Sequence, residues 1–295
     1  MYTNVAATSA TPEGPFTNPK SMSNLKYAYS KDGKQGWDSG MGMGDFGFFV
    51  DQHGADADGF PSAYLIYNCR SWNSWWNGKA SGMSTASIVV EKLNDDFTDG
   101  GGWHGTEVSG NLRELSAGAG AYTTQESPAM YRSPKGKYVV MTAGATCFGM
   151  PQPEAAPWGG TGIFAYVSPS PLGPYEYFGN INNRDGNLSD TNASTACGMC
   201  PSNSPPFACQ LGNCALPVQL NSIARKHDGS PLGLTGSTWA LKSDGAGAAA
   251  VTNVLGDYGE YWQPWELFVD ENGLPKPLVF HRDISLDTNI TIHDQ

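Results

Sequence analysis

The segment Gly44-Asp-Phe-Gly-Phe-Phe-Val-Asp51, followed by Ala63-Tyr-Leu-Ile-Tyr67, decides the fold class. Both runs are rich in aromatic and β-branched residues, which favour strands, and Asp56-Ala-Asp-Gly59 between them is typical of a turn. The same plan returns in Ala129-Met-Tyr131 and Lys137-Tyr-Val-Val-Met141, on either side of a Pro-Lys-Gly turn. A hairpin that recurs in this way predicts an all-β fold of the sandwich, barrel or propeller type.

Composition agrees with many short strands joined by turns. The 295 residues include 37 Gly and 20 Pro, with 12% aromatic and 15% charged residues, and helical periodicity is scarce. We expect one domain over residues 1–295, which is enough chain for a sizeable core. The predicted strands are Phe46 to Val50, Ala63 to Asn68, Ala86 to Lys92, Tyr138 to Ala143, Gly162 to Val167, Thr238 to Lys242 and Leu278 to His281.

Charge and hydropathy argue against two classes of partner, nucleic acids and membranes. A formal net charge of −11 without a basic stripe makes a nucleic-acid partner improbable. No apolar stretch is long enough to span a membrane. An acidic chain rich in Trp and Tyr fits a neutral ligand such as a sugar, although simple solubility explains the charge equally well.

Three stretches read as loop insertions, at residues 71–84, 99–121 and 185–215, because they are rich in Gly, Ser, Asn or Cys and lack alternation. The first contains Trp72, Trp75 and Trp76, which either stack on sugar rings or pack the loop onto the domain. Within the third, Cys197-x-x-Cys200 has the spacing of a zinc knuckle.

Disulfides are the preferred reading of the cysteines. The six cysteines are an even number, and three N-glycosylation sequons begin at Asn187, Asn192 and Asn289. Both features favour an oxidising compartment, so we expect a secreted, extracellular protein. The cysteines are Cys69, Cys147, Cys197, Cys200, Cys209 and Cys214.

Several landmarks, taken in order, resemble the β-propellers of glycoside hydrolase family 43, and most closely the branch that cleaves β-1,3-linked galactan (galactan β-1,3-galactosidase, or exo-β-1,3-galactanase). The resemblance covers most of the chain outside the three insertions, and it implies a five-bladed β-propeller. The landmarks are Ser9-Ala-Thr-Pro-Glu-Gly-Pro-Phe16, its recurrence at Ser168-Pro-Ser-Pro-Leu-Gly-Pro-Tyr175, the opening segment 44–51 with 63–67, Val90-Glu-Lys-Leu-Asn-Asp-Asp-Phe97, Glu126-Ser-Pro-Ala-Met-Tyr131, Leu216-Pro-Val-Gln219 and Tyr261-Trp-Gln-Pro264.

The resemblance also implies an incomplete propeller. In the family, the landmark around Asp45 lies in the third blade, whereas only 44 residues precede it here. We therefore expect about three to four blades, with the chain beginning inside the second. Residues 1–10 have neither the charged nor the apolar region of a signal peptide, so we expect the secretory start upstream.

Three residues match the family's catalytic positions. Glu126 corresponds to the general acid, at the start of a blade's inner strand. Asp45 corresponds to the carboxylate that tunes the pKa of the acid and orients it. Gln219 corresponds to a glutamine that positions water in the galactanase branch, where the usual aspartate base is missing. The alternatives are a Glu bonded to a loop backbone, an Asp at a turn and a polar strand residue, respectively.

Further expectations concern sugar binding, metals and oligomeric state. Tyr261 and Trp262 either wall a sugar subsite or pack within a blade. No residue matches the glutamate that the branch carries on its second blade. The five histidines show no metal-ligand spacing, so we predict no metal site and no cofactor; some family members hold a structural calcium, for which no ligands can be placed here. We expect a monomer.

Two classes of function therefore stand side by side. The first is an inverting, exo-acting glycosidase on β-1,3-galactan, with a polysaccharide or oligosaccharide as its partner. The second is a non-catalytic carbohydrate-binding, degenerate or truncated propeller. Another family 43 specificity, such as arabinan or xylan, is a variant of the first.

Overall fold

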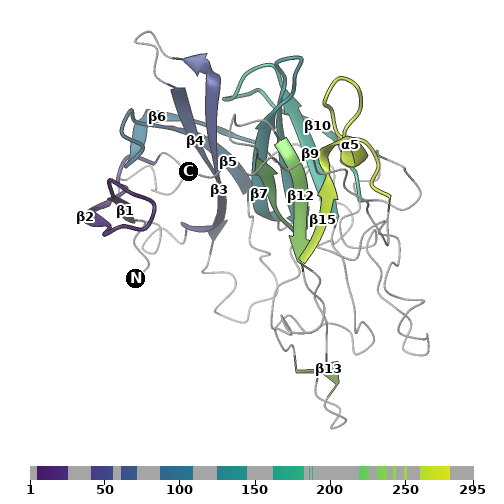
Figure 1. Ribbon diagram of the computed structural model, residues 1–295, viewed down its shortest axis with the longest axis horizontal. Coiled ribbons are helices and arrows are strands. Elements are labelled where there is room, and N and C mark those ends of the chain that lie inside the picture. Colours follow the sequence, from purple (N-terminus) through teal and green to yellow (C-terminus); the bar gives the residue numbers. More distant parts are fainter. Residues whose placement is uncertain are drawn as a thin grey trace, which may run out of the picture.

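A computed structural model describes residues 5–25, 41–55, 61–71, 87–108, 125–144, 162–182, 186, 188, 219–225, 231–237, 242–243, 249–250 and 260–279. Nearly all of these residues lie in strands or in the turns between them, as the sequence predicted (Figure 1). The six cysteine side chains, the sequons, and the tryptophans at 72, 75 and 76 lie outside the described part.

Two four-stranded antiparallel sheets form the centre of the molecule. In each, the strands follow one another in space in chain order, which is the meander of a propeller blade. The first sheet comprises β3 (Met41–Ala55), β4 (Pro61–Ser71), β5 (Ser87–Leu93) and β6 (Gly100–Glu107), and the second comprises β7 (Gln125–Arg132), β8 (Tyr138–Gly144), β9 (Ile163–Ser168) and β10 (Glu176–Asn180).

A third sheet has the order β11-β12-β15 and leads into a single helical turn, α5. Two small hairpins, β1-β2 and β13-β14, complete the described elements. Their bounds are β11 (Gln219–Arg225), β12 (Pro231–Ser237), β15 (Glu260–Pro264), α5 (Trp265–Phe268), β1 (Val5–Thr8), β2 (Thr17–Ser21), β13 (Lys242–Ser243) and β14 (Ala249–Ala250).

The first strands of the three sheets lie next to one another, since β3 contacts β7 and β7 contacts β11. We call β3, β7 and β11 the inner strands. Consecutive meanders that meet through their first strands are the arrangement of propeller blades, so the expected fold is confirmed. Among the described residues the three sheets do not close into a ring, and the propeller is partial (Figure 1).

The recurring Gly-Pro landmark forms the same structure twice. Its first copy joins β1 to β2 and its second joins β9 to β10, and the bonds Gly14–Pro15 and Gly173–Pro174 are both cis. The β1-β2 hairpin is therefore built like the outer two strands of the second sheet.

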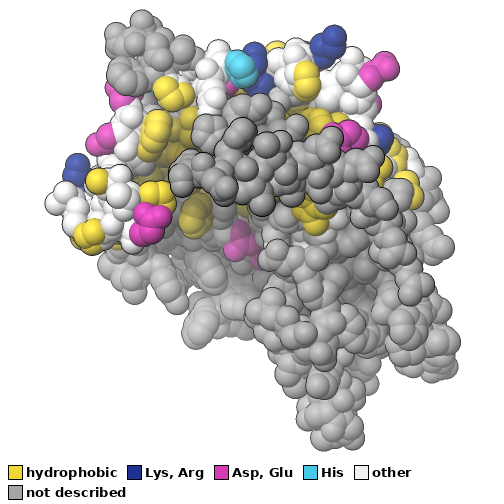
Figure 2. Space-filling view, viewed as in Figure 1, with side chains coloured by type: hydrophobic (Ala, Val, Ile, Leu, Met, Phe, Trp, Pro, Cys, Tyr) yellow, Lys and Arg dark blue, Asp and Glu magenta, His cyan; other side chains and the backbone are white. Residues whose placement is uncertain are grey.

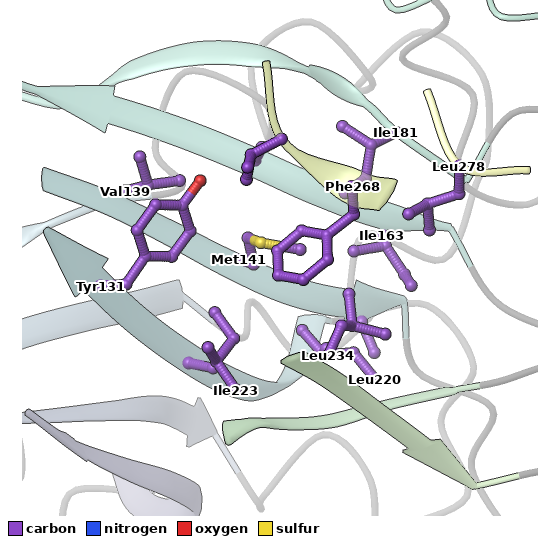
Figure 3. Packing of buried hydrophobic residues seen from close by; sticks show 14 residues of the cluster. Tyr131, Val139, Met141, Ile163, Ile181, Leu220, Ile223, Leu234, Phe268 and Leu278 are labelled. Atoms are coloured by element: carbon purple, nitrogen blue, oxygen red, sulfur yellow. The ribbon is translucent and has the colours of Figure 1, made fainter. Parts of the chain in front are cut away.

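Alternation along the strands produces two cores, one on each face of the second sheet. Odd-numbered residues such as Tyr131 and Met141 pack against the third sheet and α5 (Figure 3). Even-numbered residues such as Val140 and Tyr166 pack against Ile66 and its neighbours in the first sheet. Because strand side chains alternate between faces, a sheet enclosed on both sides must be apolar on both. The far face of the first sheet carries a third cluster, which includes Leu25 and Leu65.

Two expectations were wrong in detail. The predicted insertion 99–121 begins with strand β6. This strand was not predicted because it starts with three glycines, which are uncommon in strands. A Cβ on Gly100 would collide with the backbone of Asn24, and one on Gly101 would lie 2.6 Å from the Leu93 carbonyl oxygen, so close backbone contacts explain these glycines. The predicted strand from Leu278 is irregular where described, although the Leu278 amide donates to the Ile181 carbonyl (2.8 Å).

Candidate active site

Each inner strand contains a β-bulge against the second strand of its own sheet. In all three cases the pairing register shifts by one residue within the strand. The extra residue falls at Gly44-Asp45 on β3, at Ser127-Pro128 on β7 and at Asn221 on β11. Bulges bend a strand, redirect its side chains and are common beside active sites.

The three candidate catalytic residues lie at these bulges. Asp45 is within the first bulge, Glu126 immediately precedes the second, and Gln219 lies two residues before the third. The repeated sheet structure thus places them at comparable positions on three neighbouring strands. The side chain of Gln219 lies outside the described part; its backbone pairs with Ser237 at the start of β11.

Glu126 is buried, with 7% of its surface exposed. It pairs with Ala143, a member of the core between the second and third sheets. Cross-strand partners share a face of the sheet, so Glu126 lies on the face that turns towards the third sheet.

Asp45 is exposed and is fixed to the bulge of β7. Its Oδ2 accepts hydrogen bonds from the amide of Ser127 (3.2 Å) and from the Ser127 hydroxyl (3.3 Å). Ser127 directly follows Glu126, so Asp45 of β3 is hydrogen-bonded to the residue next to Glu126 on β7. Ser127 has a left-handed φ of 47°, a conformation that is unfavourable for residues with a Cβ and that often marks functional sites.

A glycine explains how β3 comes so close to β7. A Cβ on Gly47 would collide with the carbonyl oxygen of Pro128 and lie 3.4 Å from its carbonyl carbon. The two backbones therefore touch two residues beyond Asp45, and only glycine permits this approach. The contact sets the separation across which Asp45 reaches Ser127.

The two aromatic residues predicted to wall a sugar subsite lie on β15 of the third sheet. Trp262 of β15 pairs with Thr235 of β12, and β12 lies between β15 and β11 in the third sheet. Its half-buried indole lies against Gly233, where a Cβ would collide with it. This contact favours the packing role that the sequence left open. The side chain of Tyr261 lies outside the described part.

Sequence reasoning missed Ser127 and Gln125, the two neighbours of Glu126. Ser127 precedes Pro128, and residues before proline normally avoid helical conformations, so the sequence predicts an extended residue rather than a left-handed one. Gln125 is a buried amide that bonds Tyr166 and Thr142. Nothing in the local pattern distinguishes it from a surface glutamine.

Two further features bear on cofactors and surroundings. Within the described ranges, no group of three His, Cys, Asp or Glu side chains is placed to hold a metal ion, and no described helix is long and apolar enough to cross a membrane. On the face shown in Figure 2, the described Lys and Arg side chains are scattered among acidic ones rather than gathered in a stripe.

Comparison with known proteins gives similarity at the level of structure. No family model matches the chain, and no curated protein matches it. Among solved structures, it is similar to a family 43 β-1,3-galactosidase, with a TM-score of 0.47 and 14% identity over 94% of this chain and 38% of that one. It is also similar to an exo-β-1,3-galactanase from Phanerochaete chrysosporium with galactose, with a TM-score of 0.43 and 14% identity over 93% of this chain and 41% of that one.

A family 43 arabinoxylan arabinofuranohydrolase from Bacillus subtilis gives a TM-score of 0.44 and 17% identity, over 93% of this chain and 44% of that one. The chain thus spans about two fifths of the length of these three proteins. The similar structures thus include members of glycoside hydrolase family 43, the family that the sequence landmarks resemble. These members act on different substrates.

Proposed function

We propose that this chain carries the catalytic centre of a glycoside hydrolase, with Glu126 as its general acid. One observation carries the proposal: Asp45 and Glu126 lie at the bulges of adjacent inner strands, and Asp45 bonds the residue that follows Glu126. Glycoside hydrolysis by inversion needs an acid for the leaving oxygen and a second group that directs water to the opposite face of the sugar.

The two carboxylates suit different roles because their environments differ. Glu126 is buried and Asp45 is exposed. An inverting glycosidase places its acid in a buried position with a second carboxylate nearby, and the burial of Glu126 and the attachment of Asp45 to Ser127 match that arrangement. Asp45 is thus a positioning and charge-tuning residue, held by Ser127.

Gln219 completes the proposal as the group that positions the attacking water. A neutral amide orients water through its donor and acceptor atoms but is a weak base. Its place on β11, the inner strand that contacts β7, is compatible with that role. On these grounds we propose exo-cleavage of β-1,3-galactan with inversion by a secreted, monomeric protein.

A non-catalytic carbohydrate-binding function is the second candidate. It is favoured by Phe46 and Phe48, which are 64% and 47% exposed on β3. Exposed aromatic rings bind the apolar faces of sugars without any chemistry. The same feature is compatible with an enzyme, so activity has to discriminate between the two.

The test is galactose release from β-1,3-galactan by the purified chain, beside Glu126→Gln and Glu107→Gln. Glu107 is an exposed carboxylate at the end of β6, and its substitution makes the same chemical change away from the bulges. The proposal predicts activity in the parent and in Glu107→Gln, and a loss of at least about 100-fold in Glu126→Gln, the scale expected for a general acid. Proton NMR of the first product reports inversion.

Arabinan and xylan are assayed in parallel, because another specificity would change the substrate and leave the dependence on Glu126 intact. Equal activity in Glu126→Gln and the parent would overturn the assignment of the acid. A folded chain that binds galactan without hydrolysing any of these polysaccharides would favour the second candidate.

A further inference from the structure

We propose that Gln125 is a positioning residue that joins the bulges of β3 and β7 and thereby fixes the direction of Glu126. The inference rests on the proposed function, because it assigns a role towards the proposed acid. Gln125 is 2% exposed and is the first residue of β7, directly before Glu126.

Gln125 is bonded from both bulges. Asn68 lies opposite the bulge of β3, and its Nδ2 donates to the Gln125 backbone carbonyl at 3.4 Å. Thr142 lies opposite the bulge of β7, and its hydroxyl donates to Gln125 Oε1 at 2.7 Å. The two register shifts that present Asp45 and Glu126 therefore share one residue as an anchor.

A third partner fixes the orientation of the amide. Gln125 Nε2 donates to the Tyr166 hydroxyl at 2.8 Å, and that hydroxyl also lies 3.0 Å from Oε1. Tyr166 is fully buried in the core between the first and second sheets. Burial raises the pKa of Tyr166 well above its usual range, so the phenol stays neutral and keeps both its donor and its acceptor.

These bonds hold Gln125 on one face of β7, towards the first sheet. Consecutive strand residues point to opposite faces, so Glu126 is directed to the other face, towards the third sheet. A glutamine suits the anchor because its side chain both accepts and donates. Leucine would leave the hydroxyls of Tyr166 and Thr142 without their partner, and glutamate would add a buried charge next to the acid.

The experiment compares Tyr166→Phe with Tyr131→Phe. Both remove one hydroxyl from a fully buried tyrosine. Tyr166 bonds Gln125, whereas Tyr131 bonds the Gly273 carbonyl at 3.1 Å, near the opposite end of β7. The primary readout is the titration of Glu126 by carbon-13 NMR in protein labelled at the glutamate carboxyls, with its signal assigned by its loss in Glu126→Gln.

The proposal predicts that Tyr166→Phe and Gln125→Leu move the titration midpoint of Glu126 by roughly 1 pH unit, the usual spread that protein environments impose on a carboxyl group. Tyr131→Phe leaves the midpoint unchanged. Where the parent hydrolyses galactan, Tyr166→Phe lowers kcat about tenfold or more and shifts the pH profile with little change in KM, because misdirected catalytic groups lose rate.

An unchanged Glu126 midpoint in folded Tyr166→Phe and Gln125→Leu proteins overturns the proposal, whatever their activity. So does an equal shift in Tyr131→Phe, which would indicate a general loss of packing. The midpoint is measured without substrate, so an inactive parent would overturn the proposed function and leave this inference to be decided by the titration.

Discussion

Gly47→Ala tests whether the contact between β3 and β7 builds the site. The new methyl group would meet the Pro128 carbonyl, and restoring an ordinary van der Waals contact requires the strands to separate by about 1 Å. The hydrogen bonds from Ser127 to Asp45 are already 3.2 and 3.3 Å long. A further separation of that size breaks both, because hydrogen bonds of this type weaken steeply beyond about 3.5 Å.

Two quantities follow from this displacement. Overpacking of a tight contact costs about 1–3 kcal/mol of unfolding free energy, which lowers Tm by roughly 2–12 °C in a domain of this size. If the proposed function holds, galactan hydrolysis falls about 100-fold, as expected when a group beside the reaction is displaced by about 1 Å. Differential scanning fluorimetry and the galactose-release assay measure the two effects on the same preparations.

Gly136→Ala is the matched control. Gly136 lies in the turn between β7 and β8 with a φ of 80°, so alanine there costs about 1–2 kcal/mol through the left-handed backbone alone. Both variants should have a lower Tm than the parent, and only Gly47→Ala should have lower activity. Equal activity per folded molecule in the two variants would refute the idea that the spacing of β3 and β7 positions Asp45.

Two further predictions concern Ser127 and Tyr138. Ser127→Ala removes the hydroxyl that bonds Asp45 but keeps the strained φ, whereas Ser127→Gly removes the hydroxyl and also relieves the strain. We expect the glycine variant to be the more stable of the two by about 0.5–1 kcal/mol in urea unfolding. A more stable alanine variant would contradict the left-handed conformation of Ser127. Tyr138 donates to buried Asp51, and burial followed by this bond raises the pKa of Tyr138 to about 12. Because the unfolded phenol ionises near pH 10, the contribution of Tyr138 to stability is complete below that pH and falls as the pH rises towards 12. In thermal melts, Tyr138→Phe should therefore reduce the fall of Tm between about pH 10 and pH 12. The same fall of Tm in the variant and the parent would count against the bond to Asp51.

The sheets were predictable from sequence because their signal is local. Alternation and turn residues place the hairpin of β3 and β4 and that of β7 and β8, and the repeated Gly-Pro landmark marks two equivalent hairpins. Strand β6 was missed because its glycines serve backbones far away in the chain, such as that of Asn24. A local pattern cannot reveal such a partner.

For the candidate site, the sequence predicts residue types but not their arrangement. Family resemblance selected Glu126, Asp45 and Gln219, and the structure adds that Asp45 reaches the residue after Glu126. The bulges could not be predicted from the sequence. A bulge is an extra residue in one strand relative to its partner, so it depends on the register between strands that are paired in the fold. The conformation of Ser127 opposes the local preference of a residue before proline, so tertiary structure must impose it.

The bulges also explain why the site is formed between sheets rather than within one. Each inner strand is bent at a comparable position, and close contact between β3 and β7 turns two such bends into one hydrogen-bonded unit at Asp45 and Ser127. A bulge also occurs on β11, where Gln219, an amide, precedes it in place of a carboxylate. The repeated bulge therefore carries different side chains on successive strands, and under the proposed function one blade repeat would supply an acid, a neighbouring carboxylate and a water-orienting amide without any change of fold.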